Sequence, residues 1–488
     1  MKKTTVSICI IALLVGLLCG CSNKAKEQTD TLRIMAQFKT ENLDPTVGTS
    51  HDPNVMSSVF GALIRRGENR SLEPAIIQDW TMSEDALETT FTIREGVKFS
   101  DGSDLTADDV IFSLDKMKED PLLMYSYGKY TWEKIDDLTF TMTSASVLND
   151  PAELLSVSFI VPSDSYDAET FIKNPIGAGP YKITSIETDG TVNLTANEYY
   201  YDEAPHYKTL VIKAPLNASA AVIALQNGEV DILMNAASDQ LPIVRDDDRF
   251  EVVETSGYTS TGVWFYGPMR DDQNLRLAIA YAIDREKLVA IACNGEATVS
   301  SDLIASKTLG KLAGAVPMSK FDVEKAKEYL AASNYHKGDV LTLTVFDKPA
   351  DAQCIMDDLK EIGIEVTIEQ MDMNSFYQAV MEGNMGMCIM SNGAENATTA
   401  RLLQNFSSAG GDSIVFSDEC DALIAQCASE ADAEKRDELC KQIMEIQAEL
   451  CNVAPLYETN GNICYVKSIE GITEYAASAT YLYPETLK

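Results

Sequence analysis

Carboxylates are the side chains best placed to do chemistry in this sequence. Asp101, Asp104, Asp108 and Asp109 gather around a glycine turn. A glycosidase needs only two carboxylates across a cleft, so such a cluster is compatible with a hydrolase. The same residues are also typical of a turn and a helix start, because Asp-Gly favours a turn and Thr106 with Asp109 resembles a capping box. No G-x-S-x-G, H-E-x-x-H or P-loop pattern accompanies them, so we interpret these acids as turn and cap residues and expect no enzyme.

The chain as a whole is large, apolar enough to fold and strongly acidic. With 488 residues and a prior of roughly 150 residues per domain, about three structural units are expected. The 45% hydrophobic content is typical of a globular protein. The net charge of −36 excludes a typical nucleic-acid binder, because affinity for phosphate backbones depends on clustered cations.

The N-terminus predicts export. Lys2 and Lys3 precede an apolar run over residues 6–18. That run is too short to cross the roughly 30 Å hydrocarbon core of a bilayer as a standard helix. We therefore interpret residues 1–20 as a signal peptide.

A lipid anchor is expected directly after the signal peptide. Residues 18–21, Leu-Cys-Gly-Cys, are similar to a lipobox in which Cys21 is lipidated, although Cys19 departs from the usual small residue. Residues 21–30 then form a polar, lipidated tether. Acyl chains on Cys21 would hold the protein on the outer face of the cytoplasmic membrane, on the extracellular or periplasmic side.

Cysteines and histidines offer little for metal chemistry. His51, His206 and His336 are scattered and no C-x-x-C pair is present, so we expect neither a metal site nor a cofactor. An even cysteine count in an exported chain is compatible with disulfides, whereas thiols at apolar helical positions serve as small hydrophobic side chains. Both alternatives remain open for eight cysteines of the second half: Cys293, Cys354, Cys388, Cys420, Cys427, Cys440, Cys451 and Cys464.

Residues 88–117 predict two strands followed by a helix. Phe91 and Ile93 alternate with polar residues, and Val97 and Phe99 repeat that alternation. Beyond the glycine turn, apolar residues recur at helical spacing from position 110 to 117.

The second half of the chain predicts an α/β unit. Residues 341–347, 350–362 and 364–371 read as strand, helix and strand, which is typical of a parallel crossover. Residues 274–292 carry apolar residues on one helical face and predict a single helix, and residues 432–450 predict a long helix.

Two blocks of this sequence closely resemble a known family. The first contains LEPAIIQDW, TFTIREGVKFSDG and LTADDVIFSL, and the second contains NPIGAGPYKI, NEYYYDEAPHYKTL and ALQNGEVDIL. The residues of these segments, and the order of the segments, resemble family 5 of the extracellular solute-binding proteins of ABC transporters. That family includes oligopeptide, dipeptide and nickel-complex binders. The resemblance covers about residues 31–475.

The resemblance implies a two-lobed, periplasmic-binding-protein-like (Venus flytrap) α/β fold with an extra subdomain in the first lobe. Two strands near residues 253–265 and 455–466 would cross between the lobes. The implied ranges are 31–255 for the first lobe, about 50–172 for its inserted subdomain, 256–463 for the second lobe, and 464–488 for a C-terminal return to the first lobe.

The resemblance also implies a function. A monomer would capture a peptide between its lobes and deliver it to an ABC permease and ATPase complex. A metal chelate, haem or oligosaccharide as ligand, or a ligand-sensing surface receptor, are the alternatives. Nucleic acid is not an expected partner.

Nine residues are candidates for contact with the ligand. Glu395 stands where peptide binders have an aspartate for the ligand's amino group, and Trp264 lies beside an expected crossing strand. Each aromatic candidate has a core position as its alternative, and Glu395 and the histidine have an ordinary loop position. The candidates are Trp264, Tyr266, Asn392, Glu395, Asn396, Tyr125, Tyr127, Trp132 and His51.

Overall fold

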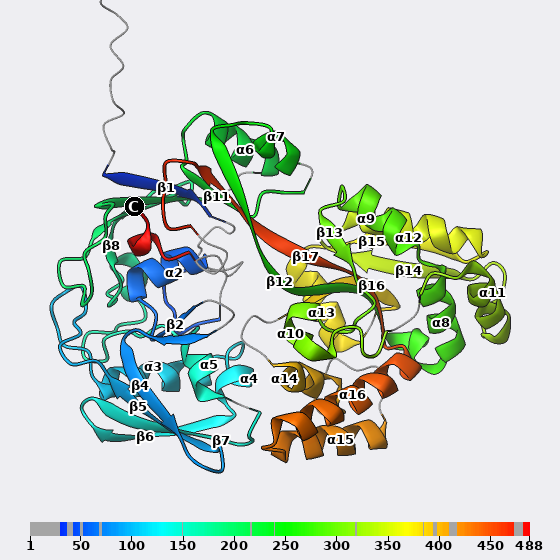
Figure 1. Ribbon diagram of the computed structural model, residues 1–488, viewed down its shortest axis with the longest axis horizontal. Helices are drawn as coiled ribbons and strands as arrows, with labels where there is room; N and C mark the ends of the chain where they lie inside the picture. The colour runs from blue at the N-terminus through cyan, green and yellow to red at the C-terminus, as the bar shows by residue number, and fades with distance from the viewer. Residues whose placement is uncertain are drawn as a thin grey trace, which may run out of the picture.

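Two lobes lie side by side and are joined by two long strands, β12 (Phe250–Phe265) and β17 (Val453–Val466) (Figure 1). This computed structural model describes residues 30–36, 42–48, 52–67, 71–148, 150–214, 217–238, 240–317, 320–383, 385–393, 398–408, 417–472 and 482–488.

One mixed sheet continues through both lobes. Its strands alternate buried and exposed side chains where one face is covered; in β1, for example, Leu32 and Ile34 are fully buried. Eleven described strands take part, with β13 (Ala297–Val299) attached to β17. The order of the others is β15 (Glu365–Gln370), β14 (Val340–Val345), β16 (Met387–Gly393), β12, β17, β11 (Ile232–Met234), β1 (Thr31–Met35), β10 (Thr209–Lys213), β9 (Val192–Ala196) and β8 (Tyr181–Ile186).

The strands β12 and β17 belong to both lobes because each changes its neighbours along its length. The start of β12 pairs with the end of β17, Phe250 opposite Val466, where β17 also pairs with β11 of the first lobe. The end of β12, up to Phe265, pairs with β16 of the second lobe. Between these parts the register shifts between Thr255 and Thr259. An irregularity in the middle of a two-stranded connection is a natural place for a hinge.

The inserted subdomain of the first lobe is a small sheet covered by a helix. Residue Asp109 accepts a hydrogen bond from Thr106 N at 2.9 Å, so the predicted cap starts α3 (Ala107–Glu119). The strand order is β4 (Ile77–Met82), β5 (Glu88–Ile93), β7 (Thr139–Ser144) and β6 (Tyr130–Asp136), and a separate pair joins β2 (Ile64–Arg66) to β3 (Leu72–Pro74).

The second predicted strand of this subdomain is wrong. Val97 and Phe99 are buried, as alternation requires, but they join no sheet ladder. Phe99 N instead donates to Ser103 O at 2.9 Å, and Leu105 N donates to Val97 O at 2.9 Å. The tight turn at Gly102 (φ 92°) folds the segment back on itself and uses these backbone groups locally.

The remaining helices divide between the two lobes, and α4 and α5 lie beside the small sheet of the subdomain (Figure 1). Those of the first lobe are α2 (Pro53–Phe60), α4 (Met124–Tyr127), α5 (Pro151–Leu155), α6 (Ala218–Gln226) and α7 (Leu241–Arg245). Those of the second lobe are α8 (Gln273–Ala282), α9 (Arg285–Ala292), α10 (Ser306–Leu309), α11 (Val323–Ala332), α12 (Pro349–Glu361), α13 (Met373–Glu382), α14 (Thr399–Leu403), α15 (Asp418–Ser429) and α16 (Ala433–Leu450).

The second lobe confirms the predicted crossover and the long helix, and corrects one element. Strands β14 and β15 pair in parallel across α12, and α16 covers the predicted range. The single helix predicted over 274–292 is two helices, α8 and α9. Ile283 is extended (ψ 117°), and Asp284 caps the new helix by accepting from Lys287 N at 3.0 Å. The apolar period continued across this break and concealed it.

The cysteine alternatives are decided in favour of buried free thiols. All eight described cysteines are free and buried, most of them in the core of the second lobe. Cys427 Sγ and Cys440 Sγ lie 3.9 Å apart between α15 and α16, a thiol hydrogen bond and not a disulfide. Each thiol therefore serves chiefly as a small apolar side chain.

Candidate functional site

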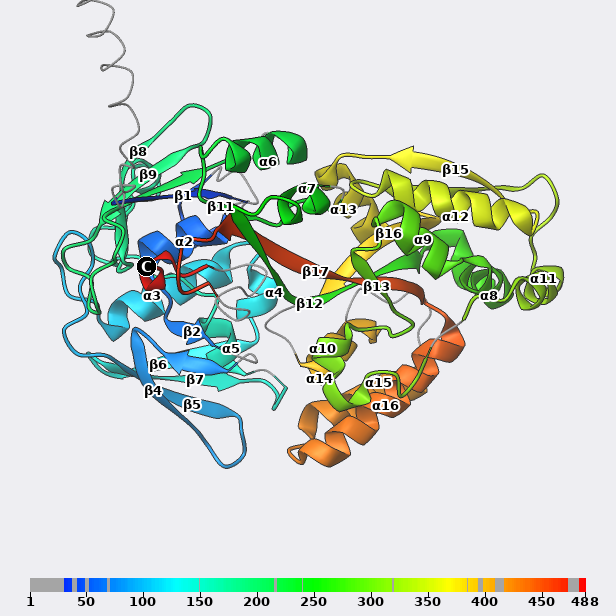
Figure 2. The same ribbon diagram turned by 45° about the horizontal axis from the view of Figure 1, so that its top comes forward.

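The two lobes touch each other beside the crossing strands β12 and β17. Leu148, after β7 of the first lobe, is 8% exposed and packs in the same buried cluster as the core of the second lobe. Helices α4 and α5 of the first lobe face α10 and α14 of the second in both views (Figures 1 and 2). On the far side of the crossing strands, Arg245 Nη1 lies 2.6 Å from Glu296 Oε1, an ion pair between α7 and the segment before β13.

The second-lobe wall is held by a stack of aromatic rings. The indole of Trp264 on β12 stacks on Phe406 at 5.9 Å between ring centroids, and its Nε1 donates to Met390 O at 3.2 Å. Thr399, at the start of α14, donates through Oγ1 to Thr308 O at 2.9 Å. These contacts fix α14, and with it Arg401, at the boundary between the lobes.

The first-lobe wall presents a lysine directly after α4. Lys129 is half-buried at the start of β6, and its backbone oxygen accepts from Ala145 N at 3.1 Å. Burial, with a smaller contribution from the charge of Arg401, lowers the pKa of Lys129 to about 8. The two cations come from opposite lobes and repel each other.

The nearby acidic residue, Asp150, already accepts a hydrogen bond within the first lobe. Asp150 caps α5 by accepting from Ala152 N at 2.9 Å, and burial raises its pKa. Tyr130 lies in the electrostatic range of both Asp150 and Arg401, and burial raises its pKa. In the described part of the chain, no carboxylate forms an ion pair with Lys129.

Several predicted site residues lie in packed cores. Trp264 and Tyr266 are 1% and 5% exposed and belong to the core of the second lobe. Tyr127 is 5% exposed in the core of the subdomain; its hydroxyl lies 3.0 Å from Ser158 Oγ, and burial raises its pKa to about 12. Trp132 on β6 donates through Nε1 to Asp115 Oδ1 at 3.0 Å, and Lys118 Nζ lies 5.0 Å from its ring centre.

Asn392 is the predicted residue with unused hydrogen-bonding capacity. It lies on β16 opposite Ser260 of β12, and its buried side-chain Nδ2 has no hydrogen-bond partner among the residues that the structure describes. Such a donor is available to a ligand or an ordered water. Tyr125 lies in α4. His51, Glu395, Asn396 and Cys21 lie outside the described residues.

The structure does not bring the predicted residues into one described cluster. Trp264, Tyr266 and Asn392 lie in the second lobe, whereas Tyr127 and Trp132 lie in the subdomain of the first. The sequence did not single out Lys129 and Arg401, although Lys129 stands between the candidates Tyr127 and Trp132. A cation within the aromatic run was the only available signal, because the approach of the two charges depends on the packing of distant segments.

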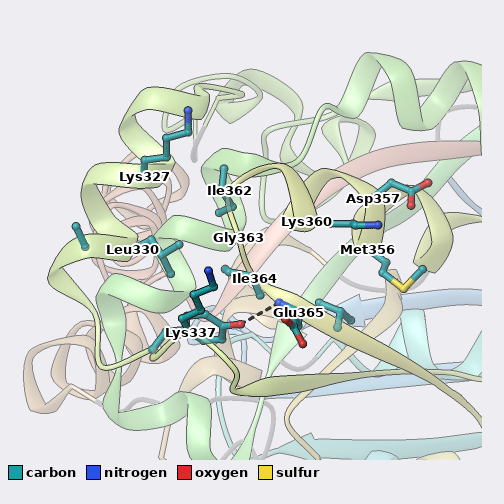
Figure 3. Close-up of a pocket in the computed structure, with 13 residues that line it drawn as sticks. Lys327, Leu330, Lys337, Met356, Asp357, Lys360, Ile362, Gly363, Ile364 and Glu365 are labelled. Atoms are coloured by element: carbon teal, nitrogen blue, oxygen red, sulfur yellow. Dashed lines mark hydrogen bonds between the residues drawn. The ribbon is translucent and has the colours of Figure 1, made fainter.

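The pocket in Figure 3 belongs to the outer end of the second lobe. It has a volume of about 830 Å³ and is lined by residues of α11, α12 and β15 and their connections, including Lys327, Lys337 and Lys360. No first-lobe residue lines it, and α11 lies at the edge of the molecule in both views (Figures 1 and 2). Movement between the lobes therefore cannot close it around a ligand.

Metal and membrane features are absent from the part of the chain that the structure describes. No group of three or more His, Cys, Asp or Glu side chains is arranged to hold a metal ion there. None of the described helices is both long and apolar enough to cross a membrane.

Residues 71–413 match the profile of the bacterial extracellular solute-binding proteins, family 5. The chain belongs to this family. The dipeptide-binding protein of Escherichia coli is 25% identical over 488 aligned positions, covering 88% of this chain and 90% of that protein. Haem-binding protein A of Haemophilus influenzae is 24% identical over 445 positions, covering 82% and 81%.

Solved structures share the two-lobed architecture. A dipeptide-binding protein of Pseudoalteromonas sp. SM9913, in complex with Met-Leu, superposes with a TM-score of 0.82 at 18% identity, covering 94% of this chain and 99% of that one. The fold expected from the sequence is therefore confirmed. As a family 5 protein, the chain is the extracellular solute-binding component of an ABC importer and not an enzyme.

Proposed function

We propose that this solute-binding protein captures peptides between its lobes and delivers them to its ABC permease and ATPase complex. The observation that carries the proposal is the near full-length match to a dipeptide-binding protein. Beyond Cys388, the edge of β16 that faces away from β12 has no partner strand among the described residues, and such an edge suits an extended peptide, whose backbone groups need partners.

Closure follows from the arrangement of the crossing strands. A ligand that contacts both lobes favours the closed arrangement by the free energy of its extra contacts with the second lobe. The irregular pairing near Gly257 lets the lobes rotate while the ends of β12 stay bound to their own lobes. We place the lobe boundaries within these strands, at residues 255 and 463.

We propose Asn392, with its unused Nδ2, as a ligand-binding residue of the second lobe. Glu395 and Asn396 follow on the same segment, and Glu395 is the proposed partner of a ligand amino group. Trp264 and Tyr266 support this wall from the core, and Tyr127 and Trp132 pack with the core of the opposite lobe. Tyr125 and His51 are proposed as ligand contacts from the sequence.

We further propose that the mature protein is a monomer held by acyl chains on Cys21. The support is the lysine pair, the short apolar run and the lipobox-like residues 18–21. Mass spectrometry of protein expressed in a bacterial host tests this directly. A diacylglyceryl mass on Cys21 is expected, and an unmodified or uncleaved N-terminus would contradict the anchor.

A haem-binding function is the second candidate, because haem-binding protein A is similar over most of its length. Isothermal titration calorimetry separates the two. Soluble protein is titrated with mixed dipeptides, mixed pentapeptides, oligosaccharides and haem. Heat with peptides alone supports the proposal, whereas heat with haem or sugars and none with peptides would overturn it.

A further inference from the structure

The pocket at the outer end of the second lobe has an apolar floor (Figure 3). Ile362 and Ile364 are 8% and 0% exposed and belong to the core of that lobe, whereas the neighbouring apolar side chains are only partly covered by the described residues. The volume of about 830 Å³ falls in the range of roughly 300–1,000 Å³ that is usual for small-molecule sites. The apolar side chains of the floor are Leu330, Met356, Ile362, Ile364 and Val366.

Hydrogen bonds within the second lobe hold the walls of this pocket. The hydroxyl of Tyr335 accepts from Glu365 N at 2.9 Å, a bond drawn in Figure 3, and donates to Asp339 O at 2.7 Å. Gly363 (φ 89°) makes the turn from α12 into β15 in the left-handed region that favours glycine. The pocket is therefore formed without a ligand, and its shape does not depend on movement between the lobes.

Three lysines surround the apolar floor. Lys327 comes from α11, Lys337 from the segment before β14 and Lys360 from the last turn of α12 (Figure 3). Lys327 pairs with Glu324 at 3.0 Å. Lys337 and Lys360 are exposed, and neither pairs with a carboxylate among the residues that the structure describes.

The two acidic residues of the pocket leave its lining positive. Asp357 accepts from Gln353 Nε2 at 3.1 Å on its own helix, and Glu365 contributes the second carboxylate. Two carboxylates against three ammonium groups give the lining a net charge of +1, in a chain whose net charge is −36. A cationic rim over an apolar floor is complementary to a molecule with an anionic head and an apolar body.

We propose that this outer pocket is a second ligand site, which binds a small anionic amphiphile with one carboxylate or phosphate group and an apolar chain. The apolar chain covers Leu330 and Met356, and its removal from water favours binding. The anionic head accepts charge-assisted hydrogen bonds from Lys337 and Lys360, whose flexible stems extend over apolar surface.

This ligand is distinct from the solute that the protein captures for transport. No first-lobe residue lines the pocket, so its occupant gains no contact when the lobes close and does not favour closure. A peptide between the lobes and an amphiphile in the outer pocket are therefore expected to bind at the same time. The proposal does not rest on peptide capture.

Calorimetry on the soluble mature chain tests the proposal with octanoate and octyl phosphate, which distinguish a carboxylate head from a phosphate head. Octanol supplies the apolar chain without the charge, and acetate and inorganic phosphate supply the charge without the chain. We expect at least one of the two amphiphiles to bind. We expect the molecules with a single feature to bind at least about tenfold more weakly, because each lacks one part of the complementary surface.

Two exposed lysines provide the variant. The double exchange Lys337→Gln/Lys360→Gln is expected to weaken binding of the amphiphile by at least about tenfold and to leave the weak binding of octanol unchanged. The matched control is Lys441→Gln, an exposed lysine of α16 in the same lobe that lies 3.9 Å from Glu445. Both proteins are expected to keep the Tm of the wild type, since exposed charges contribute little to stability.

A methionine methyl group locates the bound molecule. The carbon-13 methyl resonance of Met356, assigned by its loss in Met356→Leu, is expected to shift when octanoate or octyl phosphate is added. The resonance of Met56, which is buried in the core of the first lobe, is the control and is expected to stay in place.

The outcomes separate this proposal from peptide capture. Absence of binding by both amphiphiles, equal affinity in the double lysine variant, or a Met356 resonance that does not move overturns the proposal. Displacement of the amphiphile by peptides also overturns it, because the amphiphile would then lie between the lobes. Lysine-dependent binding of an amphiphile without any peptide binding supports the proposal and contradicts peptide capture alone.

Discussion

Single residues at the lobe boundary divide into those that support the walls and those that face the ligand. Trp264 is a supporting residue: its ring is 1% exposed, stacks on Phe406 and donates to Met390 O. We expect Trp264→Ala to lower the free energy of unfolding by about 3–5 kcal/mol, because it leaves a large cavity. Denaturant unfolding measures this. Trp132→Ala, at a half-buried position, serves as control and is expected to cost much less.

A variant that kept its stability but lost ligand binding would assign Trp264 a different role. If Trp264→Ala kept the stability of the wild type and abolished ligand binding, the indole would be a ligand-contacting residue. We predict instead that any loss of ligand affinity in Trp264→Ala accompanies a loss of folding stability.

The protonation of Lys129 is also set at the residue scale, chiefly by its burial. The pKa of Lys129 is lowered to about 8, so its positive charge is lost as the pH rises through that value.

The free energy of unfolding should depend on this charge. The folded-state pKa of Lys129 lies below that of the unfolded chain, so the unfolded state binds more protons between about pH 8 and the usual lysine pKa of 10.5. The unfavourable contribution of Lys129 is thus complete below about pH 8 and diminishes as the pH rises. Denaturant melts of wild type and Lys129→Gln at pH 7 and pH 9.5 isolate this contribution. The difference in the free energy of unfolding between the two proteins should be smaller at pH 9.5.

At the scale of elements, the β7 to α5 connection carries the apolar contact between lobes. Leu148 is buried against the core of the second lobe. Leu148→Ala removes apolar area that is buried only when the lobes are in contact. The burial of this area stabilises the contact by about 1–2 kcal/mol. We expect ligand affinity to fall about tenfold while the unfolding midpoint changes little. Leu122→Ala, at a position 70% exposed, is the control; a drop in stability with unchanged affinity would contradict this role.

The crossing strands contain a glycine that the hinge requires. A Cβ on Gly257 would lie 2.1 Å from Thr459 O, closer than any real contact, at the point where the pairing of β12 with β17 is irregular. Gly257→Ala is therefore expected to displace β17 and change the lobe angle. Small-angle scattering of the ligand-free protein measures this change as a shift in radius of gyration. Gly386→Ala, where the nearest atom to a Cβ would be Thr342 O at 3.4 Å and φ is not positive, tests whether any glycine exchange has the same effect.

Elements governed by local rules were predictable. The cap of α3 and the crossover of β14, α12 and β15 follow from short patterns that tertiary packing did not alter. The break between α8 and α9 was missed because the apolar period continued through Ile283. The charges of Lys129 and Arg401 could not be placed together from sequence, since their approach depends on the angle between lobes and on packing that buries one of them.

At the scale of the whole molecule, the thiols report on the integrity of both cores. Every described cysteine is buried and free, and Cys427 with Cys440 is the closest pair. Protein beginning at residue 30 is expected to resist alkylation when native and to gain eight adducts when denatured without reductant. Intact mass measures this, and six adducts would indicate one disulfide.

A measurement on the intact molecule also tests whether a peptide is bound between the lobes. Native mass spectrometry of protein purified without refolding, followed by release and sequencing of any bound molecule, is the most direct test. We expect a mass increase that disappears on denaturation, and we expect the released molecule to be a peptide. A released haem, oligosaccharide or metal chelate, with no peptide, would contradict it.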